Sequence, residues 1–314
     1  PSKSGSGESD TTTWLYDIHV YPKNGIADKP TKTINSEQTD LVLNADVTWT
    51  ISQKIPTLTG PTSNFTEASI SDPLDPRLTY VSGVVSIDSP NGANIVPADY
   101  VFDSSGLTWT FTETGLAKLK ANQGKTLTAT VVTTVTSISA DGKTPGVVYN
   151  EATVSFNQKP QTTPKSYTYW GDLVVTKHDA SNQAALAGAQ FKVFAKGDGA
   201  CAATMPATGA LATGTSDATG VVKWDHRAPA ASPLSLWVAN SNTEIANPSK
   251  QYCLYESQAP AGYTPITTPW TVTITPATTA SPEAIFTQSV GNTKVRGPNL
   301  PLTGSTGTAV FVIG

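Results

Sequence analysis

The class of fold is indicated by the stretch Thr126-Leu-Thr-Ala-Thr-Val-Val-Thr-Thr-Val-Thr-Ser137. Threonine and valine dominate it, and β-branched side chains favour an extended backbone. Short apolar and β-branched runs recur on both sides of it, for example at 107–111 and 147–156, and turn residues separate them. Many short strands at this spacing predict an all-β sandwich.

A second series of strand candidates runs from residue 167 to residue 290. The Pro/Thr-rich segment 158–165 separates the two series and reads as a linker. We therefore expect a flexible arm at 1–13, a first domain at 14–160, a second domain at 161–296 and an exposed tail at 297–314. The only helical turn that we expect lies at 115–121.

The composition narrows the classes of function. Charged residues make up 14% of the 314 residues, against about 25% in ordinary soluble domains. The net charge is −4, and the sequence has no cluster of basic residues to hold nucleic-acid phosphates. The three histidines are scattered without the spacing of metal ligands, so we expect no metal and no cofactor.

The two ends of the chain carry distinct patterns. Trp14-Leu-Tyr-Asp-Ile-His-Val-Tyr-Pro-Lys23 alternates like a strand that ends at Pro22, which places Lys23 at a turn. The polar residues at the start of the given sequence do not have the pattern that we expect of a signal peptide. The apolar run 308–314 is much shorter than the roughly 20 residues of a membrane span. We expect the chain to be a fragment of a longer precursor.

Three motifs in order resemble those of the major (shaft) pilins of Gram-positive bacteria, which sortases assemble. The run from Trp14 to Lys23 is similar to their pilin motif, Trp followed by Val-x-Val-Tyr-Pro-Lys, with Ile18 in place of the first valine. Leu300-Pro-Leu-Thr-Gly304 is similar to a sorting signal, and 252–263 to the E-box, with Ser257 in place of threonine. The resemblance covers residues 14–304 and implies the middle and C-terminal domains of such a pilin.

The resemblance implies two tandem immunoglobulin-like (Cna-type) β-sandwich domains, CnaA-like at 14–160 and CnaB-like at 161–296. It also implies that a sortase cleaves between Thr303 and Gly304, within the signal Leu300, Pro301, Leu302, Thr303 and Gly304. Thr303 would then be joined to Lys23 of the next subunit. The lysine must be neutral to attack, and the sortase is expected to supply that activation.

The product would be a covalent fimbria, extracellular and anchored in the cell wall, that supports adhesion and colonisation. Its partners would be other copies of the chain, pilin-specific and housekeeping sortases and minor pilins; host receptors stay open, and no nucleic acid is expected. The chain would be a sortase substrate and not an enzyme. The alternative is a monomeric wall-anchored adhesin, which would need the sorting signal but not the pilin motif.

The resemblance further implies a self-made Lys–Asn isopeptide bond in each domain, promoted by a buried acid. We expect Lys177–Asn292 with Glu256 as the catalytic acid, and Lys32–Asn150 with Asp72. Burial would favour the neutral amine and the protonated carboxyl. Lys29 stays open as an alternative to Lys32, and an ordinary Lys–Glu ion pair with a capping asparagine is the alternative in the second domain.

The chain has two cysteines, Cys201 and Cys253. In an extracellular protein an even pair predicts one disulfide, and two buried thiols are the alternative. The bond would tether the loop after residues 191–194 to the E-box strand.

Overall fold

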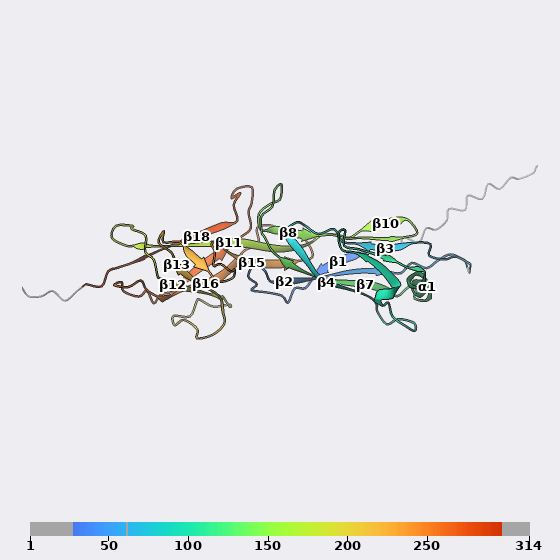
Figure 1. Cartoon of the computed structure of the whole chain (residues 1–314), viewed down its shortest axis with the longest axis horizontal. Coiled ribbons are helices and arrows are strands. Elements are labelled where there is room, and N and C mark those ends of the chain that lie inside the picture. The colour runs from blue at the N-terminus through green and yellow to red at the C-terminus, as the bar shows by residue number, and fades with distance from the viewer. Residues whose placement is uncertain (1–27, 61, 297–314) are drawn as a thin grey trace, which may run out of the picture.

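The computed structural model describes residues 28–60 and 62–296, which form two β-sandwiches arranged end to end along one axis (Figure 1). The predicted all-β class with two tandem sandwiches is confirmed. Among the described residues there is no helix with the length and apolar character that a membrane crossing requires.

The first sandwich consists of a four-stranded and a five-stranded sheet. The four-stranded sheet has the order β1 (Thr31–Ile34), β2 (Asp46–Lys54), β7 (Thr126–Val135), β4 (Leu78–Ile87). The five-stranded sheet has the order β10 (Lys159–Thr162), β9 (Thr153–Phe156), β3 (Ala68–Ser71), β6 (Thr108–Phe111), β5 (Tyr100–Asp103). A 3-10 turn, η1 (Pro97–Asp99), and one helix, α1 (Glu113–Ala121), complete this half.

The second sandwich also has two sheets. One has the order β15 (Leu234–Ser241), β11 (Ser166–Asp179), β18 (Ile285–Asn292), and β8 (Val147–Asn150) also pairs with β11. The other has the order β14 (Val222–Trp224), β13 (Ala210–Ser216), β12 (Gln190–Ala195), β16 (Lys250–Gln258), β17 (Trp270–Ile274). β11 and β18 run parallel, and the other pairings described here are antiparallel.

The Thr/Val-rich stretch forms β7, in the middle of the first sheet. Its residues alternate between buried and partly exposed along the whole strand. Leu127, Ala129, Val131, Thr133 and Val135 point into the core, while the alternate positions, mostly threonine, lie on the outer face. This period of two is the expected pattern for a sheet with one face packed and the other solvated.

Each sandwich has its own apolar core. Trp49 and Trp109 are fully buried in the first core, and Phe191 and Trp224 in the second. Trp170, from the second series of strands, also packs into the first core. The two halves therefore share packed side chains at their junction.

Two local expectations were wrong. Residues 147–156 were expected to form one strand, but the chain breaks after Asn150 and continues in another sheet as β9. The segment 158–165 was expected to be a linker, but it contains β10, which pairs with β9 through a two-residue turn. Asn157 and Gln158 have positive φ in that turn, as hairpin turns require, and Pro160 is tolerated because β10 is an edge strand.

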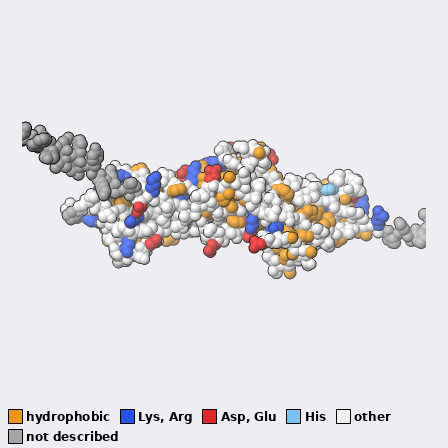
Figure 2. Space-filling view, turned by 180° about the vertical axis from the view of Figure 1, so that it is seen from behind, with side chains coloured by type: hydrophobic (Ala, Val, Ile, Leu, Met, Phe, Trp, Pro, Cys, Tyr) orange, Lys and Arg blue, Asp and Glu red, His pale blue; other side chains and the backbone are white. Residues whose placement is uncertain are grey.

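The junction between the sandwiches is held by backbone hydrogen bonds as well as by packing. Leu43 N donates to Ser235 O at 3.1 Å, and Trp237 N donates to Leu41 O at 2.9 Å. Val42 also forms a β-bridge with the β15 strand. The face of the molecule drawn in Figure 2 is mostly uncharged, with scattered basic and acidic groups.

Candidate functional site

The first candidate site begins with Lys32, at an inward-facing position of β1. Lys32 is only 2% exposed, and its Nζ lies 5.7 Å from the centre of the Trp49 ring. The Nζ donates a hydrogen bond to Oδ1 of Asp72, which directly follows β3 and is fully buried. Lys29, the other lysine considered for this site, is exposed, so only Lys32 lies against the buried acid.

Asn150, the last residue of β8, completes this cluster. Its Nδ2 lies 3.4 Å from Oδ2 of Asp72, and its Oδ1 is buried without a hydrogen-bond partner. One carboxyl group therefore contacts the amine of Lys32 with one oxygen and the carboxamide of Asn150 with the other. All three predicted residues are brought together, although they are far apart in the sequence.

The electrostatics of this cluster favour neutral groups. Burial lowers the pKa of Lys32 to about 8, although the nearby Asp72 acts in the opposite direction. Burial likewise raises the pKa of Asp72, against the attraction of Lys32. Loss of hydration thus outweighs the charge pairing, and a proton can pass from the amine to the carboxyl at low cost. A neutral amine is a nucleophile and a protonated carboxyl is an acid.

The second candidate site contains Lys177 of β11, 1% exposed. Its Nζ donates to Val290 O at 2.9 Å and to His178 O at 3.2 Å. Burial lowers the pKa of Lys177, and the nearby Glu256 and Asp179 act in the opposite direction. The strand alternation that predicts a buried lysine and an outward His178 agrees with their burial.

Asn292 ends β18, the strand that runs parallel to β11. Its Nδ2 donates to Glu256 Oε2 at 2.9 Å and to Thr264 O at 2.8 Å. The same Glu256 oxygen accepts from Ile266 N at 2.9 Å. The other oxygens, Glu256 Oε1 and Asn292 Oδ1, are buried without partners. Here the acid contacts the amide, and the amine of Lys177 contacts the neighbouring backbone instead.

The disulfide prediction is confirmed, because Cys201 and Cys253 are bonded. The bond ties the loop after β12 to β16, as expected. Under the loop, the rings of Phe194 and Tyr255 meet edge to face at 5.5 Å, and the Tyr255 hydroxyl donates to Ala202 O at 2.8 Å. The disulfide-tethered loop therefore covers a small apolar cluster on the outer face of the sheet.

Lys23 and the segment 300–304 lie outside the described residues. The roles assigned to them in linking subunits therefore stay predictions. Within the described ranges there is no group of three or more histidine, cysteine or acidic side chains that would hold a metal ion.

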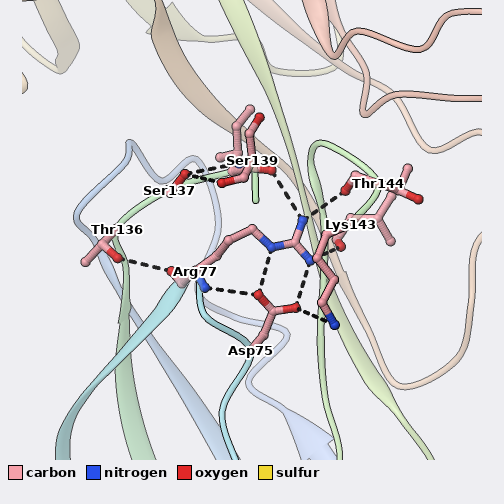
Figure 3. A network of polar contacts seen from close by, with 9 residues as sticks. Asp75, Arg77, Thr136, Ser137, Ser139, Lys143 and Thr144 are labelled. Atoms are coloured by element: carbon pink, nitrogen blue, oxygen red, sulfur yellow. Dashed lines mark hydrogen bonds and ion pairs between the residues drawn. The ribbon is translucent and has the colours of Figure 1, made fainter. Parts of the chain in front are cut away.

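Asp75 and Arg77, which stand on either side of Pro76, form a buried ion pair that the sequence did not predict (Figure 3). Arg77 is 1% exposed and is surrounded by backbone carbonyl groups. Charged residues beside prolines are ordinarily solvated, and no pattern in the single sequence distinguishes this pair from such residues.

Comparison with known proteins agrees with this architecture. A family model described as a prealbumin-like fold domain of the SpaA type matches residues 171–285. The fimbrial subunit type 2 of Actinomyces naeslundii is 27% identical over 95% of this chain and 59% of its own length. The fimbrial subunit type 1 of Actinomyces viscosus is 25% identical over 97% of this chain and 64% of its own length.

The chain thus spans about three fifths of the length of these two relatives. Among solved structures, domains D2 and D3 of the major pilin SpaD from Corynebacterium diphtheriae match with a TM-score of 0.63 and 22% identity. That match covers 85% of this chain and 99% of the SpaD chain. It supports the same two-sandwich fold. Together, these findings show that this chain is similar to the fimbrial subunits of Actinomyces and contains a prealbumin-like domain of the SpaA type.

Proposed function

We propose that this chain is a structural subunit of an extracellular pilus shaft, and that each of its two sandwiches is closed by an isopeptide bond. The observation that carries the proposal is the buried cluster of Lys32, Asp72 and Asn150, in a chain related to fimbrial subunits. A lone buried ion pair is a costly way to stabilise a core. A neutral amide in the same place removes that cost.

The proposed reaction joins an amine and a carboxamide without an oxidant or reductant. The Nζ of Lys32 forms a bond to Cγ of Asn150, and the bond from Cγ to Nδ2 breaks. Asp72 contacts both groups, so it can pass its proton to the departing Nδ2 and accept one from the attacking amine. One ammonia leaves, and a secondary amide remains.

The same chemistry is proposed for Lys177 and Asn292, with Glu256 as the acid. Glu256 Oε2 lies 2.9 Å from the Nδ2 that would depart, which suits delivery of a proton to it. Lys177 is already held beside β18, but its Nζ must leave the carbonyl of Val290 to reach Asn292. In a model that treats the crosslinks like disulfides, each would remove unfolded-state entropy worth about 4.7 kcal/mol for a loop of about 100 residues.

For assembly, we propose that a sortase cleaves between Thr303 and Gly304 and joins Thr303 to Lys23 of the next subunit. The fimbrial relatives support polymerisation with other pilin subunits. The rival function, a monomeric wall-anchored adhesin, does not require Lys23. In both cases the protein serves as a structural component and not as an enzyme.

Incubation with a pilin-type sortase separates these functions. The wild-type chain should form a ladder of covalent polymers, and Lys23→Ala should abolish it. Lys29→Ala is the matched control, because it removes a nearby exposed lysine and should leave the ladder intact. Ladders that persist in Lys23→Ala would overturn the proposed linkage.

Intact mass tests the internal bonds separately. The oxidised wild-type chain should be lighter than its sequence by two ammonia molecules and by the two hydrogens lost on disulfide formation. Asp72→Asn should retain one of the two ammonia molecules, and so should Glu256→Gln. A wild-type mass that shows no loss of ammonia would remove both crosslinks from the proposal.

A further inference from the structure

A buried guanidinium organises the connection between β7 and β8 (Figure 3). Arg77 donates from Nε to Oδ1 of Asp75 and from Nη2 to Oδ2, both at 2.8 Å. Its Nη1 donates to Thr144 O at 2.9 Å and to Ile138 O at 3.3 Å, and Nη2 donates to Val147 O at 2.8 Å. All five N–H donors of the side chain are used, so its position is strongly determined.

The carbonyl groups that Arg77 binds all belong to one piece of chain. Ile138 and Thr144 lie in the loop before β8, and Val147 is the first residue of β8. Asn150 follows three residues later, at the other end of this short strand. Arg77 therefore holds the strand that carries the proposed reacting amide.

The segment that carries Arg77 also carries the proposed acid. The sequence Asp72-Pro-Leu-Asp-Pro-Arg77 connects β3 to β4, and its two prolines restrict its backbone. Asp72 N donates to Leu107 O at 3.0 Å, and Leu78 N donates to Asp75 O at 2.9 Å, which ties both ends of the segment. The acid and the guanidinium are thus parts of one rigid support.

Sheet pairing alone does not align β8 with this support. β8 pairs with β11 of the second sandwich, whereas β9 pairs with β3 of the first. Lys32 lies on β1, in yet another sheet. One further tie exists, since the Ser166 hydroxyl of β11 donates to Lys32 O at 2.7 Å. Apart from the contact of Asn150 itself, Arg77 makes the direct polar link between β8 and the segment 72–77 that carries Asp72.

We propose that Arg77 is a positioning residue for the Lys32–Asn150 crosslink, which holds β8 so that the Asn150 amide meets Asp72. This inference rests on the proposed function of the cluster. Arg77 contacts neither the amine nor the amide, so it acts through the backbone of β8. Loss of these hydrogen bonds should slow formation of the first crosslink and leave the rate of the second, Lys177–Asn292, unchanged.

The experiment follows both crosslinks during cell-free synthesis of the whole chain, stopped at successive times and analysed by peptide mapping. Arg77→Lys keeps the charge opposite Asp75 but cannot reproduce the planar fork of donors. We expect the rate of the first crosslink per folded molecule to fall by about tenfold or more, since a displacement of about 1 Å can cost about 100-fold. The second crosslink, within the same molecule, is the internal reference.

Two control variants separate positioning from stability. Lys143→Ala removes a partly exposed partner that lies 3.9 Å from Asp75 Oδ2 and should leave the rate unchanged. Lys118→Met breaks another ion pair of the first sandwich, with Asp99 at 2.6 Å, and should lower stability without slowing the crosslink in folded molecules. In Arg77→Lys the rate should fall by the same factor across the pH range, because Arg77 contacts neither the reacting amine nor the amide.

The outcomes are distinguishable. A folded Arg77→Lys chain that forms the first crosslink at the wild-type rate would overturn the positioning role and leave the proposed function intact. A wild-type chain that never forms the first crosslink would overturn the proposed function itself. If Arg77→Lys does not fold, Asp75→Asn carries the same test, because it keeps the size of the side chain while weakening the hold on the guanidinium.

Discussion

The two crosslinks would decide how far a single subunit can be stretched. Tension that enters before Lys32 would cross directly to Asn150, then follow the backbone to Lys177, and cross to Asn292. The segments 33–149 and 178–291 would therefore carry no load. Only the stretch between Asn150 and Lys177 would lie in the loaded backbone within the sandwiches.

Part of that loaded stretch can lengthen. Asn150 and Ser166 are paired across the β8–β11 ladder, so the intervening residues 151–165 form a closed excursion that contains the β9–β10 hairpin. Separation of β8 from β11 would release about 15 residues, or about 50 Å at about 3.5 Å per residue. When the wild-type chain is pulled at its ends, this short step should be the largest increase in length that is seen.

The catalytic-acid variants should lengthen the step by different amounts. Asp72→Asn would add 33–149, which is about 120 residues and about 400 Å. Glu256→Gln would add 178–291, but the Cys201–Cys253 disulfide closes off about 50 of these residues, so the gain is about 200 Å. Added reductant should raise only this second gain, to about 400 Å.

Single-molecule force spectroscopy with handles at the two ends measures these lengths directly. Full denaturation at low force, with steps of several hundred ångströms in the oxidised wild-type chain, would refute the proposed load path. Equal gains in Asp72→Asn with and without reductant are the control, because the disulfide lies outside that loop.

Two more predictions concern pH and the junction. In the reactive state Lys32 is neutral and Asp72 is protonated, so the pair shares one proton. Above the lowered lysine pKa of about 8 the pair loses this proton. Below the raised pKa of Asp72 it gains a second proton, and both changes remove the reactive state. The crosslinking rate, followed by mass during cell-free synthesis, should therefore be bell-shaped, and a rate that keeps rising from about pH 8 to about pH 10 would contradict the acid role. Gly146→Ala places a Cβ 2.1 Å from Trp170 O, whereas Gly142→Ala has the same sign of φ and open space. Urea denaturation should show the first variant to be less stable than the second by more than about 1 kcal/mol, and equal stabilities would argue against a tight junction.

Much of the architecture could be predicted from local patterns. The alternation in β7 and the turns around it are local consequences of side-chain type, and they indicated the all-β class. The helical turn predicted at 115–121 lies within α1, because that stretch contains good helix formers; the helix itself begins two residues earlier, after the Thr112 cap. The cysteine pairing was predictable because the chain offers only one pair.

The errors came where the path of the chain depends on distant partners. Pro160 suggested a linker, but an edge strand tolerates proline because only one side of the strand needs its N–H groups. The break after Asn150 has no local signal, since the change of sheet is decided by which strands lie beside it. The burial of Arg77 has no local signal either, because it depends on carbonyl groups from a segment about sixty residues away.

The sequence by itself determined the strands, the residue types of both crosslinking sets and the motifs at the two ends, because these depend on neighbours along the chain or on the resemblance that those motifs carry. Only the tertiary structure decided that Lys32 and not Lys29 faces Asp72, that β11 serves both sandwiches, and that Arg77 holds β8. The physical reason is burial. The packing of distant strands determines which charged groups lose water, and that loss changes a lysine from a solvated cation into a candidate nucleophile.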